Sequence, residues 1–337
     1  MPGSDDHAPV GAPAGGDHVE FGRTSGGGGA STLQRDWDNP AIGVFDGVEQ
    51  VPGAAKPDPI LTANGVTRSF GGLRAVDVDR IEVQRGAITA LIGPNGAGKT
   101  TFFNLLTRFD IPDEGTVVFD GQSTAGVRSH ELAARGMVRT FQLTKVLAKM
   151  SVIDNMMLAA QAQSGESMWR ALLNGWRPQE REVEQRALQV LDEFNMTHMK
   201  DEFAGALSGG QRKLLEMARA MMAQPRLIML DEPMAGVNPA LTQSLLGHVK
   251  RLRSEGISVM FVEHDMDVVQ DISDWVIVMA EGAVIAEGPP RSIGENPAVV
   301  DAYLGSSHAA LTEEIREAVA ADGPPAADDS AGGDGDE

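Results

Sequence analysis

A glycine-rich segment, residues 93–101, has the residue types and spacing of a phosphate-binding loop. It has the sequence Gly-Pro-Asn-Gly-Ala-Gly-Lys-Thr-Thr and lies between the apolar run 88–92 and the helix-like stretch Phe-Phe-Asn-Leu-Leu. Glycines let the backbone curl so that successive N–H groups point at phosphate oxygens, and a helix start adds partial positive charge. Lys99 could then reach the β- and γ-phosphates of a nucleotide, and the Thr100 hydroxyl could ligate Mg²⁺. This pattern favours a nucleotide site over a turn that binds nothing.

Two carboxylates, Asp231 and Glu232, directly follow a second apolar run at residues 227–230. A carboxylate at the carboxyl end of a buried parallel strand faces the ligand crevice of the sheet. There Asp231 would hold Mg²⁺, and Glu232 would orient and deprotonate a water molecule. An apolar run followed by Asp-Glu is common by itself, so the pair gains its meaning from the phosphate loop that precedes it.

A second anion site is predicted at residues 207–211, Leu-Ser-Gly-Gly-Gln, which precede the helical run 212–222. Ser208 is placed to cap this helix, and the N–H groups at a helix start can bind phosphate. An ordinary capped helix is the alternative interpretation. The position just before the Asp-Glu strand favours a functional role.

Over residues 59–305 the chain resembles the ATP-binding subunit of an ABC transporter. The glycine-rich loop matches the Walker A motif, Leu-Ser-Gly-Gly-Gln matches the family's signature, and the Asp-Glu strand matches Walker B with its catalytic glutamate. Gln142, in Arg-Thr-Phe-Gln, matches the Q-loop, and His264, in Val-Glu-His-Asp, matches the switch histidine. All five motifs agree with the family in order and spacing.

The resemblance implies a complete set of residues for binding ATP and Mg²⁺. The residues expected to act in hydrolysis are Glu232, His264, Gln142 and Lys99. The residues expected to ligate the metal are Thr100, Gln142 and Asp231. The residues expected to contact the nucleotide are Phe70, Gly93, Pro94, Asn95, Gly96, Ala97, Gly98, Lys99, Thr100, Thr101, Ser208, Gly209, Gly210 and Gln211. Phe70 lies at the A-loop position, where an aromatic ring stacks on adenine, and Asn238 ends a D-loop that commonly ends in Asp.

The resemblance also implies partners. Only one motif set is present, and in the family the signature of one subunit closes over the Walker A nucleotide of another. We therefore expect a head-to-tail dimer with a second ABC ATPase subunit, identical or different. Integral membrane permease subunits, an extracytoplasmic solute-binding protein and a peripheral location on the cytoplasmic face of the membrane are expected as well. In importers, about residues 143–157 receive the permease.

Finer sequence details are similar to the ATPase subunits of branched-chain amino-acid importers. They include Ser-Phe-Gly-Gly-Leu-Arg-Ala-Val at 69–76, Asp-Glu-Pro-Met-Ala-Gly-Val-Asn-Pro at 231–239 and Ala-Tyr-Leu-Gly at 302–305. Urea and amide importers share these features, and the lipopolysaccharide-export ATPase is also similar, so these substrates stay open as alternatives. A non-transport ABC ATPase is less favoured, because the chain carries neither a second cassette nor sustained coiled-coil heptads.

The elements that position these residues predict an α/β fold. Apolar runs alternate with helical patterns across residues 59–305, which is consistent with a P-loop NTPase. The resemblance specifies a RecA-like core, an ABC β-subdomain and a helical subdomain at about 143–219. Residues 1–58 and 306–337 are rich in Gly, Pro, Ala and Asp and predict disordered tails, although Phe45 is one of several apolar side chains in the first.

Composition limits the remaining function classes. The 337-residue chain has 48 acidic and 28 basic residues, a net charge of −20, which argues against nucleic-acid binding. Residues 1–58 hold 9 acidic and 3 basic residues and residues 306–337 hold 9 and 1, so −14 of this charge lies outside the predicted domain. The absence of cysteine excludes disulfides and thiol catalysis. The sequence has no run of 18 apolar residues and no signal-peptide pattern, which predicts a protein without a membrane span.

Overall fold

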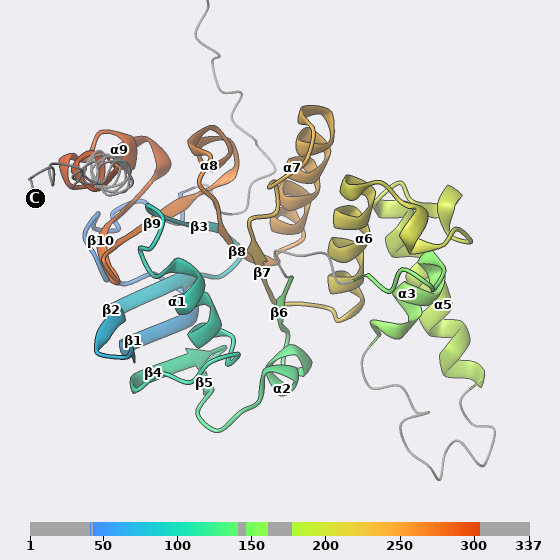
Figure 1. The fold of residues 1–337 in the computed structure, drawn as a ribbon, viewed down its shortest axis with the longest axis horizontal. Coiled ribbons are helices and arrows are strands. Elements are labelled where there is room, and N and C mark those ends of the chain that lie inside the picture. Colours follow the sequence, from blue (N-terminus) through green and yellow to red (C-terminus); the bar gives the residue numbers. More distant parts are fainter. Residues whose placement is uncertain (1–40, 42, 141–145, 161–176, 304–337) are drawn as a thin grey trace, which may run out of the picture. The chain divides into compact units, whose positions relative to one another are not determined.

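The computed structural model describes residue 41 and residues 43–140, 146–160 and 177–303 (Figure 1). Within these residues the fold is mixed α/β, as predicted, with two sheets and a separate group of helices. None of the described helices has both the length and the apolar character needed to cross a bilayer. The Q-loop residue Gln142 lies outside the described residues.

The larger sheet has six strands in the order β10-β9-β3-β8-β7-β6. All neighbouring pairs from β9 to β6 are parallel, and only the edge strand β10 is antiparallel. The three central strands are buried along their whole length, as expected for a parallel sheet covered on both faces. The strands are β3 (Ile88–Ile92), β6 (Met137–Arg139), β7 (Leu227–Asp231), β8 (Ser258–Val262), β9 (Trp275–Ala280) and β10 (Ala283–Gly288).

The smaller sheet is antiparallel, in the order β2-β1-β4-β5. Its strands are β1 (Pro59–Phe70), β2 (Leu73–Gln84), β4 (Glu114–Phe119) and β5 (Gln122–Ser123). The short helix α1 (Lys99–Leu106) buries Phe102 and Phe103 in the apolar core that this sheet shares with one face of the larger sheet. That core fixes the helix start, and with it the glycine-rich loop.

The opposite face of the larger sheet packs against the remaining long helices. Side chains alternate along each strand, so that Ile228 and Leu230 of β7 enter this second core whereas Met229 enters the first. The helices not yet named are α2 (Ser129–Ala134), α3 (Val152–Leu158), α5 (Arg177–Glu193), α6 (Gly209–Met222), α7 (Pro239–Ser254), α8 (Met266–Ile272) and α9 (Pro290–Gly294), with 3₁₀ turns η2 (Thr197–Met199) and η3 (Ala204–Ala206).

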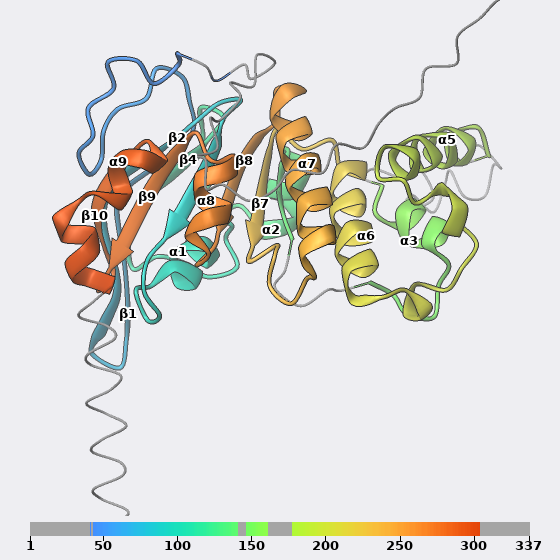
Figure 2. The same cartoon turned by 90° about the horizontal axis from the view of Figure 1, so that it is seen from above.

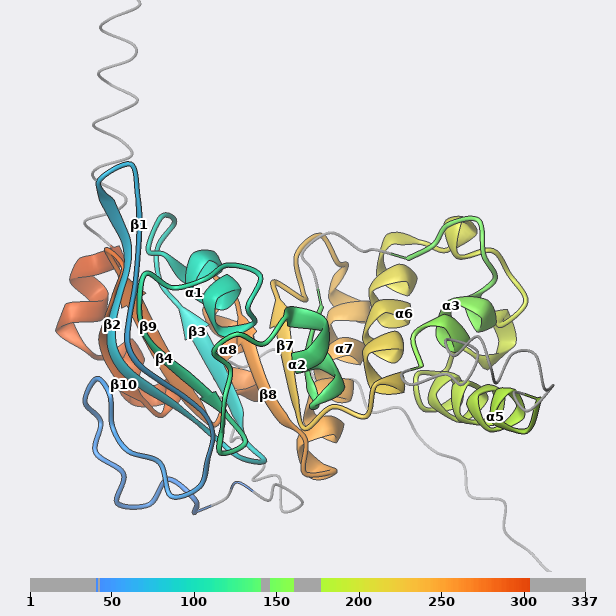
Figure 3. The same ribbon diagram turned by 90° about the horizontal axis from the view of Figure 1, so that it is seen from below.

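The helical subdomain predicted at about 143–219 contains α3, α5 and α6 among its described residues. Figures 1 and 3 show α6 between α7 on one side and α3 and α5 on the other. Leu214, Leu215 and Met217 on α6 are buried and join the helical subdomain to the core under β7. Residues 143–145 and 161–176 of the predicted subdomain lie outside the described residues.

The folded chain begins earlier than the sequence predicted. Residues 43–58, blue in Figure 2, form a strap on the domain. The Phe45 ring stacks on Trp275 of β9 at 4.8 Å, and Lys56 makes a fully buried ion pair of 2.9 Å with Glu287 of β10. Composition predicted disorder for the whole head up to residue 58. For residues 43–58 that was wrong, because the apolar partner surface is supplied by β9, more than 200 residues away.

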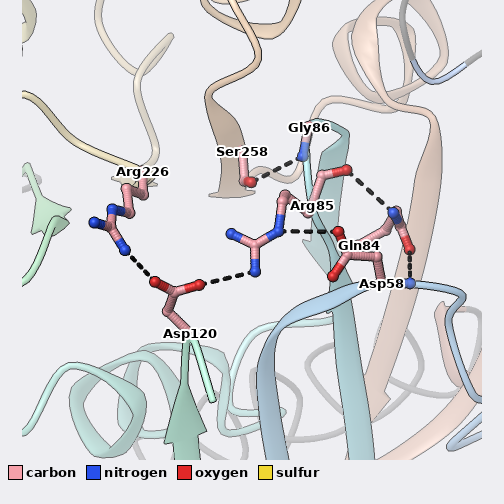
Figure 4. Close-up of polar contacts among 7 residues, drawn as sticks. All are labelled: Asp58, Gln84, Arg85, Gly86, Asp120, Arg226 and Ser258. Atoms are coloured by element: carbon pink, nitrogen blue, oxygen red, sulfur yellow. Dashed lines mark hydrogen bonds and ion pairs between the residues drawn. The ribbon is translucent and has the colours of Figure 1, made fainter. Parts of the chain in front are cut away.

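A polar cluster joins the two sheets on the side where β7 and β8 begin (Figure 4). Asp120, in the turn between β4 and β5, accepts hydrogen bonds from Arg85 and from Arg226, the residue before β7. Arg85 also pairs with Asp58 at the end of the strap. The hydrogen bond from Arg85 is the main reason that the pKa of Asp120 is lowered. These contacts hold the smaller sheet against the strand that carries Asp231.

Candidate active site

Three loops that carry chemically useful residues meet at the carboxyl ends of the parallel strands of the larger sheet. Strands β3, β8 and β7 are adjacent and parallel, so their carboxyl ends lie side by side. The glycine-rich loop follows β3, His264 lies two residues after β8, and Asp231 and Glu232 end and follow β7. The fold therefore brings together three motifs that are far apart in the sequence, at the place where parallel α/β sheets bind ligands.

Two glycines of the loop are required by close backbone contacts. A Cβ on Gly93 would lie 2.0 Å from the Met279 carbonyl oxygen, and one on Gly98 would lie 2.4 Å from that of Ala75. Gly98 also has a positive φ of 94° and is the N-cap of α1. The backbone of the loop thus packs closely against β9 and β2.

The Lys99 side chain lies inside the loop that it follows. Its ammonium donates hydrogen bonds to the carbonyl oxygens of Gly93, at 2.7 Å, and Pro94, at 2.9 Å. Burial lowers the pKa of Lys99, and the nearby Glu232 carboxylate opposes that shift. Thr100, the second residue of α1, is exposed.

Asp231 is buried and paired. Its carboxylate accepts a hydrogen bond of 2.7 Å from Arg139, the last residue of β6, and the two side chains are 5% and 6% exposed. The same guanidinium donates to the side-chain oxygen of Asn104 on α1, at 2.6 Å. Arg139, which lies three residues before Gln142, therefore connects the Walker B strand to the helix that begins at Lys99.

Glu232 has an unusual backbone conformation, with φ of 46°. Non-glycine residues seldom adopt this left-handed region. Its N–H donates to the Val262 carbonyl at the end of β8, at 3.1 Å, and its own carbonyl accepts from Lys213 at 3.0 Å. These contacts fix the direction in which the residue leaves the strand.

His264 projects from the sheet edge, and its side chain is 65% exposed. Its neighbour Glu263 is buried and accepts a hydrogen bond of 2.9 Å from the Met234 N–H. Burial raises the pKa of Glu263. Glu263 therefore joins the loop after β8 to the loop after β7.

The signature segment forms the predicted helix cap. The Ser208 hydroxyl accepts from the Gln211 N–H and the Gln211 side chain accepts from the Ser208 N–H, a reciprocal capping box at the start of α6. Ser208 and Gly209 are exposed. A Cβ on Gly210 would lie 1.6 Å from a methyl carbon of Leu241 on α7, so this glycine permits the close approach of the two helices.

The predicted adenine-stacking residue, Phe70, ends β1 and is 48% exposed. The Arg68 guanidinium lies 4.9 Å from the centre of its ring and is ion-paired with Asp110 and Asp113. Asn238 caps α7 by accepting a hydrogen bond of 3.0 Å from the Leu241 N–H. Asparagine thus has a local structural role at this D-loop position, consistent with the Asn-Pro pair at a helix start.

Sequence reasoning assigned no role to Arg139, Lys213 or Glu263, although all three lie within or next to the motifs. The Arg139–Asp231 contact depends on the pairing of β6 with β7, which no local pattern in the sequence reveals. Nothing in the sequence places Lys213 against Glu232, because that contact depends on how α6 packs.

Comparisons with known proteins agree with this geometry. Residues 76–235 match the model of the ABC transporter family, and residues 283–309 match that of the branched-chain amino acid ATP-binding cassette transporter. A probable branched-chain amino acid transport ATP-binding protein LivG of Archaeoglobus fulgidus is 42% identical, over 73% of this chain and 96% of the relative. The high-affinity branched-chain amino acid transport ATP-binding protein BraF of Pseudomonas aeruginosa is 41% identical, over 74% and 99%.

Solved structures show the same likeness. A nucleotide-free ATP-binding cassette from an ABC transporter superposes with a TM-score of 0.64 at 37% identity, covering 73% of this chain and 98% of that one. The ADP conformation of a cassette gives 0.65 at 38% identity, covering 73% and 99%. The chain therefore belongs to the ABC transporter ATP-binding family, in the branched-chain amino acid transport group, and is an ATP-binding ATPase that energises transport.

Proposed function

We propose that the chain is the ATP-hydrolysing subunit of an importer of branched-chain amino acids. The observation that carries this proposal is the combined match: two family models cover the cassette and its end, and relatives at about 40% identity carry that transport name. The proposal extends to the substrate, the metal, the roles of the site residues and the partners.

The residues present suit Mg²⁺ and a nucleotide triphosphate. A carboxylate on Asp231 and a hydroxyl on Thr100 are oxygen ligands of the kind that Mg²⁺ prefers, and the nucleotide phosphates would supply others. Bound there, Mg²⁺ would neutralise charge on the β- and γ-phosphates. The Asp231 carboxylate already contacts Arg139, so the guanidinium would share it or withdraw when the metal binds.

The other residues act on the phosphate and the water. The loop 93–101 would surround the phosphates with N–H groups, and Lys99 would exchange its two carbonyl partners for phosphate oxygens. Glu232 would orient a water molecule and accept its proton, and His264 would stabilise the charge on the γ-phosphate. Gln142 is proposed as a further contact to metal and water.

The partners follow from the accessibility of the signature helix. Ser208 and Gly209 are exposed at the start of α6, where they could contact a nucleotide held by another subunit. We propose a head-to-tail dimer with a second ABC ATPase, membrane permease subunits that the dimer drives, and a solute-binding protein that delivers the amino acid.

Glu232→Gln tests the proposed catalytic base. We expect the full-length variant to bind MgATP with wild-type affinity but to lose at least about 100-fold in kcat, the range assigned to a positioned base. Hydrolysis is measured as phosphate release and binding with a fluorescent ATP analogue. Glu295→Gln, the same change at an exposed residue after α9, is the control.

The same variants test transport. Membranes that contain the protein with its co-purifying permease should take up labelled leucine with the wild-type chain and with Glu295→Gln, but not with Glu232→Gln. Uptake of urea or an amide in place of leucine would contradict the proposed substrate. Near-normal hydrolysis by Glu232→Gln would contradict the assignment of the base.

A further inference from the structure

Glu232 is held in a backbone conformation that the residue does not favour by itself. Its φ of 46° lies in the left-handed region, where a side chain with a Cβ is crowded by the backbone. A residue stays in this region when the surrounding structure fixes it, and such residues occur often at active sites. The contacts that fix Glu232 therefore determine where its carboxylate lies.

Lys213 holds this residue from the helical subdomain. The ammonium donates to the carbonyl oxygens of both Glu232 and Pro233, each at 3.0 Å. Lys213 belongs to α6, four residues after Gly209 begins the helix. Lys213 and Asp231 also line a cavity of about 20 Å³, which has room for one water molecule. The lysine thus lies directly beside the end of β7.

Glu263 holds the same loop from the opposite direction. Its carboxylate accepts from the Met234 N–H at 2.9 Å, and the side chain is 1% exposed. The Glu232 N–H is fixed by the Val262 carbonyl just before Glu263. The loop 232–234 is therefore held at its carbonyls by α6 and at its N–H groups by the end of β8.

We propose that Lys213 and Glu263 are positioning residues that fix the backbone of Glu232 and aim its carboxylate at the attacking water. The inference rests on the proposed function, in which Glu232 is the base. Lys213 lies on α6, the helix that begins at the signature segment. A shift of α6 would therefore move the backbone of Glu232 in the same chain.

The first experiment compares Lys213→Met with Lys213→Arg in the full-length protein. Methionine keeps the length of the side chain and removes the donor, whereas arginine can still donate to both carbonyls. We expect Lys213→Met to lower kcat for MgATP at least about 10-fold, with KM, the affinity for a fluorescent ATP analogue and Tm near wild type. Lys213→Arg should recover most of the rate. Lys250→Met, which removes an ion pair with Asp271 between α7 and α8, is the matched control.

The second comparison uses Glu263→Gln and Glu263→Ala. The amide oxygen of glutamine can still accept a hydrogen bond from the Met234 N–H, so Glu263→Gln should keep most of the wild-type kcat. Glu263→Ala removes this acceptor and should lower kcat. A parallel fall of kcat, nucleotide affinity and Tm in Lys213→Met and Glu263→Ala would overturn the proposal, because it would show a general structural role.

A double variant separates this proposal from the proposed function. If Lys213 acts only through Glu232, then adding Lys213→Met to Glu232→Gln should cause no further loss of the residual single-turnover rate. An additive loss would overturn the positioning role. If Glu232→Gln is inactive while Lys213→Met hydrolyses ATP at the wild-type rate, only the positioning role fails. Full hydrolysis by Glu232→Gln would overturn both.

Discussion

At the scale of single residues, two charged groups of the site have partners within the protein. Lys99 donates to two loop carbonyls and Asp231 is paired with Arg139. Both pairs use atoms that the nucleotide and its metal would need. Binding of MgATP would therefore exchange these internal partners for ligand atoms.

Arg139 provides a test of this arrangement. Arg139→Met leaves the buried Asp231 carboxylate without its cation, which costs about 3–5 kcal/mol when one partner of a buried pair is removed. We expect urea unfolding with chelator present to show this loss. Saturating Mg-ADP should reduce the loss, because the metal gives the carboxylate a new partner.

The control for Arg139 is an exposed pair of the same kind. Arg74 and Asp77 are about half exposed, so Arg74→Met should change the free energy of unfolding by no more than about 1 kcal/mol. An Arg139→Met protein as stable as wild type without metal would contradict the pairing as a stabilising contact.

The sequence predicted the residues within the motifs better than the residues that contact them from other elements. The phosphate loop, the Asp-Glu pair and the Ser208 cap follow from local spacing, and the structure confirms the cap and brings the first two together. Arg139, Lys213 and Glu263 were not predicted to contribute to the site, because their contacts join different elements and no local pattern contains them. Gln142 lies outside the described residues, and its role stays a prediction.

At the scale of elements, the strap 43–58 is a segment for which composition alone gave a wrong prediction of disorder. Its glycines and prolines predict a chain without a core of its own, yet it closes over Trp275 and the edge strand β10. The Glu287 carboxylate accepts from Lys56, from the Gly53 N–H at 2.6 Å and from the Trp275 ring N–H at 3.0 Å. The strap thus supplies two of the three hydrogen-bond donors to this carboxylate, and Trp275 of β9 supplies the third.

Lys56→Met tests the contribution of the strap. Both side chains of the Lys56–Glu287 pair are fully buried, so the substitution should lower the free energy of unfolding by about 3–5 kcal/mol in urea titrations. The double variant Lys56→Met, Glu287→Gln should recover most of this, because a neutral amide no longer needs the cation and can still accept from Gly53. A double variant no more stable than Lys56→Met would argue that the lysine acts through packing on Trp275 instead.

At the scale of the whole molecule, the fold was predictable because its class follows from the alternation of apolar runs and helical patterns. The strand order was not, since it depends on which buried runs pair across more than 100 residues. The order places β8 between β3 and β7, and this is what puts His264 between the phosphate loop and Glu232. The grouping of these residues at the carboxyl ends of the strands therefore follows from the strand order.

The distribution of charge also belongs to this scale. Of the net −20, residues 306–337 hold −8, whereas the central residues 59–305 hold −6 and include the phosphate loop. ATP is itself an anion, so like charge elsewhere in the chain lowers its local concentration, and salt screens this effect over about 8 Å at physiological ionic strength. Any such repulsion should therefore be strongest at low salt.

Deletion of residues 306–337 should lower the KM for ATP modestly at low ionic strength, by about 2-fold or less, and leave KM unchanged at 0.5 M salt or above. The value of kcat should be the same in both proteins, because all residues proposed to act in hydrolysis lie within 59–305. The control is a full-length chain in which the nine acidic residues of 306–337 are replaced by Asn or Gln, which keeps the length and removes the charge. If the deletion changes KM or kcat at high salt while this control does not, the segment acts through specific contacts and the electrostatic account fails.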